Sequence, residues 1–243
     1  MILVFLLLST QTRIDSLENS FAQRRSIETL LELNECYLMT DQFQKSMTLL
    51  GQNERHFTLD IDKARIKFEL GNVFLFAGEI EKAHETYLGL VGRYPHLEIA
   101  NDAAERLYFM ENVRDDTLQM KCLINVVRLY ETERYDEMID SARTLLRSTV
   151  GAYAYYYLAL SYRAKGDLTL TMGALDELNA RYPDHKIYGA LFLQASVYLI
   201  LGELKEAEEL LKDIAVRAPN TIYAYQARQK LQNMGSNLDI GHQ

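Results

Sequence analysis

Residues 64 to 97, with the sequence ARIKFELGNVFLFAGEIEKAHETYLGLVGRYPHL, decide the fold of this chain. The large apolar residues of this stretch that recur at helical spacing are Leu70, Phe74, Tyr87 and Leu90. Apolar residues three or four positions apart lie on one face of a helix, and two such faces can pack together. The stretch therefore predicts a helical hairpin.

Small residues and helix-breaking residues stand where such a hairpin needs them. Gly71 on the first helix and Ala83 on the second allow the two helices to approach closely. Gly78 lies at the turn between them. Pro95 ends the second helix, because proline has no amide hydrogen and pushes Tyr94, the residue before it, out of the helical region.

The composition fits a helical globular protein. Of the 243 residues, 48% are hydrophobic and 25% are charged, which provides enough apolar surface for a large core. Three prolines and no tryptophan, with many Leu, Ala, Glu and Tyr residues, favour helices over sheets. The net charge of -8 argues against nucleic acid as a partner, since phosphate binding depends on clustered Lys and Arg residues.

The hairpin pattern recurs along the chain. All three prolines, Pro95, Pro183 and Pro219, occupy the same position in their copies. Alanine at the close-contact position is replaced by Ser46 in the first copy and by Met138 in the third, which is the most degenerate. The predicted copies lie near residues 27–59, 64–97, 119–151, 152–187 and 188–219.

Other segments lie between and after these copies. The interval between the starts at 64 and 119 exceeds one repeat of about 34 residues, so we expect an extra helix over 98–114, either unpaired or a decayed half-repeat. Asp115 and Asp116 are expected to break it, and Asp60 or Asp62 to cap the helix of the second copy. A capping helix is predicted over 221–234, followed by a polar tail over 235–243.

Residues 1–26 form a separate N-terminal segment. Ile2 to Leu8 are apolar, as in a secretory signal, but no basic residue precedes them and no small-residue cleavage site follows. The run is too short to span a membrane. It is read either as a minimal signal peptide, or as a mis-set start or the tail of a longer apolar segment. Over 12–25, Ile14, Leu17 and Phe21 predict a helix that either ends a coiled coil or caps the array.

Residues suited to catalysis or metal binding do not form a known pattern. Cys36 and Cys122 have no metal or redox spacing and are both expected to be buried thiols. The five histidines are scattered. Glu206, Glu208 and Glu209 fit a solvated helix face better than a catalytic pair of carboxyl groups. The sequence therefore predicts a protein that is not an enzyme and has no cofactor.

The repeated residues of 64–97, 152–183 and 188–219 resemble the tetratricopeptide repeat family. The resemblance implies an all-α fold, a right-handed superhelical solenoid of about five hairpins with extra helices. It also implies that the first helix of each repeat lines a concave groove that binds a peptide or partner protein. The groove residues implied by the resemblance are Arg65, Phe68, Asn72, Leu75, Phe76, Tyr153, Tyr156, Leu160, Arg163, Phe192, Ser196 and Leu199.

Two narrower comparisons refine this expectation. The chaperone-binding clamp of the family needs a lysine where Phe68 stands, so a carboxylate clamp is disfavoured, although Asn72 fits it. Helices that end in Arg93-Tyr94-Pro95 and Arg181-Tyr182-Pro183 resemble the repeats of bacterial envelope proteins, such as the outer-membrane assembly lipoprotein and the Tol-Pal coordinator. The resemblance favours the periplasm or cell envelope over the cytoplasm.

The sequence thus favours one function and keeps another open. The first is a scaffold whose aromatic, apolar groove binds a segment of another protein. The alternative is a structural envelope protein that associates with copies of itself. Nucleic acid and a stable membrane span are not expected.

Overall fold

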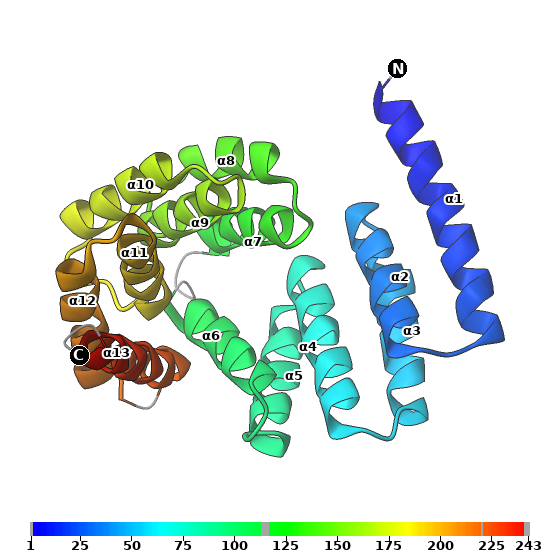
Figure 1. The fold of residues 1–243 in the computed structure, drawn as a ribbon. Coiled ribbons are helices and arrows are strands. Elements are labelled where there is room, and N and C mark those ends of the chain that lie inside the picture. Colours follow the sequence, from blue (N-terminus) through cyan, green and yellow to red (C-terminus); the bar gives the residue numbers. More distant parts are fainter. Residues whose placement is uncertain (1, 113–116, 220, 241–243) are drawn as a thin grey trace. The chain divides into compact units, whose positions relative to one another are not determined.

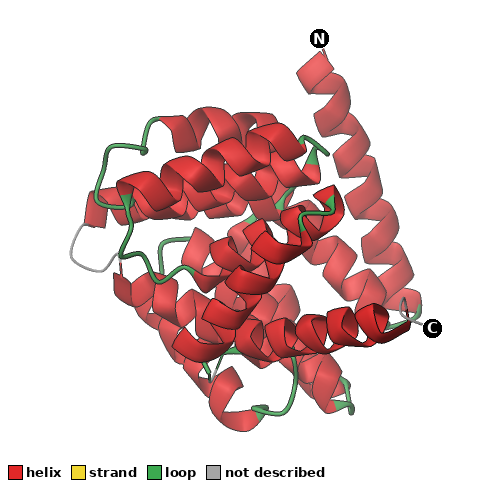
Figure 2. Cartoon of the chain, turned by 60° about the vertical axis from the view of Figure 1, so that its left-hand side comes forward, coloured by secondary structure: helices red, strands yellow, loops and turns green. Residues whose placement is uncertain are grey.

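The computed structural model describes residues 2–112, 117–219 and 221–240. This part of the chain consists of helices and loops with no strand (Figure 1, Figure 2), so the predicted all-helical class is confirmed. The expected break at Asp115 and Asp116 lies outside the described residues. The chain divides into two compact units, residues 1–115 (unit 1) and residues 116–243 (unit 2).

Unit 1 contains the first two predicted hairpins, preceded by one helix and followed by another. Its helices are α1 (Ile2–Gln23), α2 (Ile27–Met39), α3 (Phe43–Asn53), the 3-10 helix η1 (Glu54–His56), α4 (Asp60–Phe76), α5 (Ile80–Arg93) and α6 (Ile99–Asn112).

Unit 2 contains three further hairpins and a last helix. Its helices are α7 (Thr117–Glu131), α8 (Tyr135–Arg143), α9 (Gly151–Ala164), α10 (Leu168–Arg181), α11 (Tyr188–Leu201), α12 (Leu204–Arg217) and α13 (Ile222–Ile240).

The same turn joins the two helices of every hairpin. One residue adopts a left-handed conformation, and the N–H of the next residue donates to a carbonyl of the first helix at 2.8–2.9 Å, which satisfies a helix-end acceptor. The left-handed residues are Asp41, Gly78, Glu133, Gly166 and Gly202. Three of them are glycine, which adopts this conformation without steric cost, whereas the first and third hairpins place Asp41 and Glu133 there.

The position five residues after each turn is completely buried in every hairpin. It carries Ser46, Ala83, Met138, Thr171 and Ala207, and all five residues are 0% exposed. Ser46 keeps its hydroxyl satisfied by donating to Oδ1 of Asn34 on α2. The close-contact role that the sequence predicts for Ala83 and Ala207 therefore agrees with their complete burial.

The prolines end second helices as the sequence predicts. The helices α5, α10 and α12 each end at an arginine two residues before a proline. In each case the residue between them still donates its N–H to the last turn, as Tyr94 does to the Leu90 carbonyl at 2.9 Å. The helix stops at the arginine because the residue directly before the proline is forced out of the helical region.

Within each unit, consecutive helices pack in chain order. The first helices of neighbouring hairpins also contact each other directly, α2 with α4 in unit 1, and α7 with α9 and α9 with α11 in unit 2. The helix α6 contacts both α5 and α4, so it takes the place of a first helix without a second. The helix α13 does the same after α12. Within the described residues, the extra helix expected over 98–114 corresponds to α6, which packs like the first helix of a repeat.

Two helix ends differ from the sequence-based expectation. Asp60 and Asp62 lie inside the first turn of α4, and Leu59 is the capping residue, so the prediction that either aspartate caps this helix is wrong. Both carboxylates still lie at the positive end of the helix dipole. The helix α13 continues to Ile240, so residues 235–240 of the predicted polar tail are helical.

The N-terminal segment forms one helix that packs against α2. Ile14 and Phe21 of α1 are buried, and Ile14 belongs to a core cluster with Leu33 and Tyr37 of α2, against which Leu17 packs. This packing agrees with a helix that covers the end of unit 1. Among the described residues, no helix combines the length and apolar character that a membrane crossing requires.

Candidate protein-binding surface

The first helices of unit 2 meet around one glycine. A Cβ atom on Gly189 of α11 would lie 2.4 Å from Oη of Tyr156 on α9 and 2.6 Å from Oη of Tyr223 on α13. Two tyrosines from different helices therefore reach the same point on α11, and only glycine leaves room for them. This contact joins α9, α11 and α13 into one continuous layer.

A second aromatic contact extends this layer. The rings of Phe192 and Tyr223 lie 5.7 Å apart at an angle of 42°, and Nζ of Lys230 lies 5.5 Å from the centre of the Phe192 ring. Both geometries are attractive, because aromatic rings favour tilted pairs and a cation favours the face of a ring. Phe192 is partly buried. It is thus held in place while part of it stays accessible.

The predicted groove residues of unit 2 lie on α9 and α11. Seven positions were predicted there, and all seven residues keep accessible surface. The partly buried residues are Tyr153, Tyr156, Leu160, Phe192, Ser196 and Leu199, and Arg163 is exposed. Through Gly189 and Tyr223, the structure brings Tyr156 and Phe192 into one cluster. These seven residues together with Tyr223 are called the aromatic surface below.

The predicted residues of unit 1 divide into two groups. Arg65 and Phe68 of α4 are partly buried and keep accessible surface. Asn72, Leu75 and Phe76 are buried, so the expectation that these three side chains face a groove is wrong for the structure described.

Asn72 has a clear packing role instead of a binding role. Its Oδ1 accepts a hydrogen bond of 2.7 Å from the hydroxyl of Tyr87 on α5, and Tyr87 is fully buried. Phe68 packs beside the same ring, with centroids 5.9 Å apart. The amide of Asn72 thus satisfies a buried hydroxyl within the hairpin. A carboxylate clamp is already disfavoured by Phe68. It would also require Asn72 to give up its hydrogen bond with Tyr87.

The neighbouring tyrosines of α9 belong to the core. Tyr155 and Tyr157 are buried, and Tyr155 lies 6.4 Å from the ring of Tyr182. Tyr182 directly follows α10, and its hydroxyl donates a hydrogen bond to the carbonyl of Leu146 at 3.0 Å. Consecutive tyrosines on a helix point in different directions, so Tyr156 alone of this run joins the aromatic surface.

The sequence did not identify the contribution of α13. The sequence predicts a capping helix over 221–234 but does not connect Tyr223 or Lys230 with a binding surface. The available signal was Gly189, because a glycine inside a helix that is not needed for a turn often marks the close approach of another group. Gly71 and Gly151 behave in the same way toward Tyr87 and Tyr182.

The titratable residues form no metal or thiol centre within the described part of the chain. No group of three or more His, Cys, Asp or Glu residues there could hold a metal ion. Cys36 is buried, but Cys122 is exposed, so the prediction of a buried thiol is wrong for Cys122. It lies on a face of α7 that the core does not cover.

Comparisons with known proteins agree with the repeat geometry. Residues 153–185, which span α9 and α10, match the sequence profile of the tetratricopeptide repeat. The match covers most of the fourth predicted copy, near residues 152–187. A search of curated proteins finds no match.

Solved structures show weaker similarities. The TPR2AB domain of yeast Sti1, in a complex with pHSP90, has 12% identity and a TM-score of 0.42, covering 94% of this chain and 93% of that one. The TPR domain of P58(IPK) has 12% identity and a TM-score of 0.41, covering 97% and 64%. BtubC from P. vanneervenii has 14% identity and a TM-score of 0.39, covering 96% and 93%.

Proposed function

We propose that this chain is a non-enzymatic scaffold that binds a segment of another protein on the aromatic surface of unit 2. The observation that carries the proposal is the cluster of Tyr156, Phe192 and Tyr223, which three successive first helices hold in place. Aromatic anchors with few rotatable bonds supply large contact area at low entropic cost and dominate many protein interfaces.

The chemistry of the surface favours a partner segment with apolar side chains. Leu160 and Arg163 follow Tyr156 on α9 at helical spacing, and Leu199 follows Phe192 on α11 in the same way. Nζ of Lys230 lies against the Phe192 ring. Ser196 uses its hydroxyl on the Phe192 carbonyl of its own helix at 2.8 Å, so it offers mainly acceptor capacity to a partner. The segment would bury apolar groups on the rings and place acidic groups toward the two cations.

The test is capture of partner proteins from native extract by the purified chain and its variants. Phe192→Ala and Tyr156→Ala should each weaken capture, since an interface anchor typically contributes about 2 kcal/mol or more. Val216→Ala on α12 is the matched control, because Val216 is a highly exposed apolar residue of a second helix. Its capture should equal that of the wild type.

Stability must be measured on the same variants. Truncation of a core aromatic costs about 3–5 kcal/mol of folding free energy, whereas an anchor with an accessible face costs less. If Phe192→Ala and Tyr156→Ala capture the same proteins as wild type at matched folded fraction, the aromatic surface is not the binding site.

Self-association and a cell-envelope location are the alternative proposal from the sequence. The envelope location rests on the resemblance of the Arg-Tyr-Pro helix ends at Tyr94 and Tyr182 to repeats of envelope proteins. Self-association rests on the exposed faces expected near the degenerate third copy or the N-terminal helix. Light scattering on the purified chain and fractionation of cells that express it would test the two parts separately. A monomer recovered with cytosolic proteins would contradict both.

A further inference from the structure

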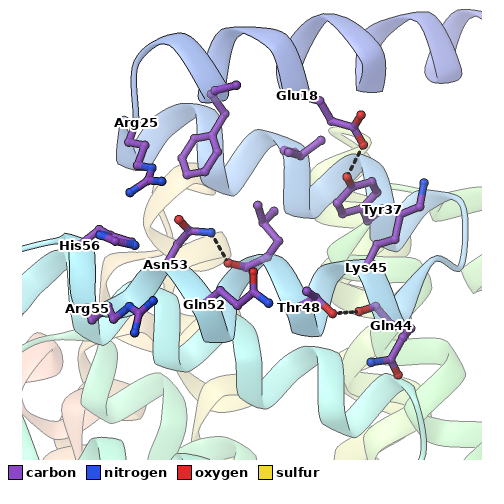
Figure 3. Close-up of a pocket in the computed structure, with 14 residues that line it drawn as sticks. Glu18, Arg25, Tyr37, Gln44, Lys45, Thr48, Gln52, Asn53, Arg55 and His56 are labelled. Atoms are coloured by element: carbon purple, nitrogen blue, oxygen red, sulfur yellow. Dashed lines mark hydrogen bonds between the residues drawn. The ribbon is translucent and has the colours of Figure 1, made fainter.

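A cavity in unit 1 combines an apolar floor with an excess of positive charge. It has a volume of about 580 Å³ and lies between α1, α2, α3 and η1 (Figure 3). It is separate from the aromatic surface, which belongs to unit 2. The residues that line it come from both sides of the α1–α2 connection and from the end of the first hairpin.

The floor of the cavity belongs to the core of unit 1. Phe21 of α1 and Leu33 of α2 are buried, and Leu49 of α3 packs against the core cluster that contains Leu33. An apolar side chain of a ligand placed on this floor would itself be removed from water, at about 25 cal/mol per Å² of its apolar area. A small inorganic anion would leave the floor uncovered.

Three cationic or titratable side chains meet at one end of the cavity. Figure 3 shows Arg25, Arg55 and His56 together there, with Arg25 from the α1–α2 connection and the other two from η1. Neither arginine forms an ion pair with any described residue. The pKa of His56 is lowered, by desolvation first and then by the positive charges of Arg25 and Arg55. An anion at this end would relieve that repulsion.

The opposite end of the cavity has no such excess charge. Glu18 of α1 accepts a hydrogen bond of 2.5 Å from the hydroxyl of Tyr37, and Nζ of Lys45 lies 5.4 Å from the centre of the Tyr37 ring. The acid and the base at this end offset each other, and both contact the same tyrosine. An acidic ligand would therefore be oriented, with its charge toward Arg25 and Arg55.

The side of the cavity formed by α3 offers hydrogen-bond donors along its length. Thr48 and Asn53 donate to carbonyls of their own helix, both at 2.8 Å. Gln44 and Gln52 form no side-chain hydrogen bond with any described residue. These two amides are eight residues apart, about 12 Å along a helix, which is the span of about four residues of extended peptide.

We propose that this cavity binds an acidic peptide segment, with carboxylates on Arg25, Arg55 and His56 and an apolar side chain on the floor of Phe21 and Leu33. A peptide supplies charge, apolar area and main-chain hydrogen-bonding groups together, and the cavity offers a partner for each of them. The overall charge of -8 opposes a long polyanion such as nucleic acid, while a segment with a few carboxylates matches the local charge.

The experiment measures binding of a fluorescein-labelled, end-blocked peptide with a central leucine between glutamates, by fluorescence anisotropy on the full chain. The peptide should bind at least about tenfold more tightly than its glutamine analogue, because the cations form charge-assisted hydrogen bonds. Replacement of the peptide leucine by alanine should weaken binding several-fold through the loss of apolar burial. A single-stranded oligonucleotide of equal charge should bind more weakly than the peptide.

The matched variants are Arg25→Gln and Arg24→Gln. Both remove one positive charge from adjacent positions, but only Arg25 lines the cavity. Arg25→Gln and Arg55→Gln should each weaken peptide binding by about tenfold, and Arg24→Gln should leave it unchanged. Equal losses in Arg24→Gln and Arg25→Gln, equal binding of the glutamine analogue, or tighter binding of the oligonucleotide would each overturn the proposal.

The pH dependence gives an independent readout. The charged groups around His56 are Arg25, Arg55 and the carboxylate of Glu54, which is paired with Lys67 at 3.2 Å. Glu18 and Lys45 line the same cavity. A bound carboxylate favours protonated His56, so affinity should rise as the pH falls from about 8 to about 5.5, while the glutamates stay ionised. His56→Gln should flatten this rise, and an unchanged rise in that variant would remove His56 from the site.

The two proposals can fail separately. Phe192→Ala lies in unit 2 and should leave binding of the acidic peptide unchanged, and Arg25→Gln should leave the aromatic surface intact. A peptide that loses affinity in Phe192→Ala but not in Arg25→Gln would assign the binding to the aromatic surface and refute the cavity.

Discussion

The contact between Gly71 and Tyr87 makes the sign of one substitution predictable. A Cβ atom on Gly71 would lie 2.5, 2.8 and 2.9 Å from three carbons of the Tyr87 ring, where carbon atoms normally stay about 3.5–4.0 Å apart. The ring has little freedom to move away, because Tyr87 is fully buried, its hydroxyl is bonded to Asn72 and Phe68 packs beside it. Gly71→Ala therefore forces α4 and α5 apart.

Two opposing terms set the size of the effect. Alanine stabilises a helix interior by about 1 kcal/mol relative to glycine, and an extra methyl in a packed core costs about 1–3 kcal/mol. Gly71→Ala should therefore lie between neutral and a loss of about 2 kcal/mol. Gly89→Ala on α5 is the control, because a Cβ there meets nothing within 4 Å. It should stabilise unit 1 by about 1 kcal/mol.

The assay is urea unfolding followed by far-ultraviolet circular dichroism. Both substitutions lie in the same helix pair of unit 1, so they report on the same unfolding transition. If Gly71→Ala raises the midpoint as much as Gly89→Ala does, α4 and Tyr87 are not in close contact and the packing argument is refuted.

A double-mutant cycle identifies the ring as the cause. The equivalent positions of the fourth and fifth hairpins carry the pairs Ala159 with Leu175 and Ala195 with Leu211, all buried. In a Tyr87→Leu background, which reproduces those pairs, Gly71→Ala should become stabilising by about 1 kcal/mol. Asn72 then loses its partner, so the double variant stays less stable than wild type.

Two further predictions concern the turns and the Arg-Tyr-Pro helix ends. Glu133→Gly should stabilise unit 2 by about 1 kcal/mol, since Glu133 has a φ of 56°, which costs an L-residue about 1–2 kcal/mol. Gly166→Ala, at the same position of the next hairpin, should destabilise unit 2. Thermal unfolding in which both substitutions change stability in the same direction would contradict this. Tyr182→Phe should cost about 1 kcal/mol of folding stability, because the Tyr182 hydroxyl donates to the Leu146 carbonyl. Tyr94→Phe should be neutral or stabilising, because the Tyr94 hydroxyl is buried without a partner among the described residues. Equal losses of stability in urea unfolding would show that the two tyrosines are equivalent.

The hairpin pattern was predictable because local chemistry marks its boundaries. Gly78, Gly166 and Gly202 supply left-handed turns, and a proline two residues after the helix end stops α5, α10 and α12. The turn at Glu133 was harder to locate, because glutamate carries no preference for that conformation and tertiary packing must impose it. The third copy was accordingly the most degenerate in the sequence.

The accessible residues were less predictable than the helices. Leu75 and Leu199 stand at equivalent positions, three residues before Gly78 and Gly202, yet Leu75 is fully buried and Leu199 is partly exposed. Spacing on a helix fixes which side chains share a face, but it does not fix what covers that face. The exposure of Cys122 was missed for the same reason, since a helical pattern around a cysteine leaves its direction open.

Glycines inside helices identify the tyrosines that hold neighbouring helices together. The chain has 16 tyrosines, so aromatic content alone cannot locate a binding surface. Tyr87 and Tyr182 each lie against a helix glycine, Gly71 and Gly151, and each ends in a hydrogen bond inside its own unit. Their rings serve to hold neighbouring helices together.

Tyr156 and Tyr223 combine that packing role with accessibility. Both hydroxyls reach Gly189, as a packing tyrosine would, but both rings remain partly buried and Tyr223 also contacts Phe192. A ring fixed at its hydroxyl end loses little further freedom when a partner covers its remaining face, so the entropic cost of binding there is reduced. The glycine that fits α9, α11 and α13 together is thus also the feature that prepares the aromatic surface for a partner.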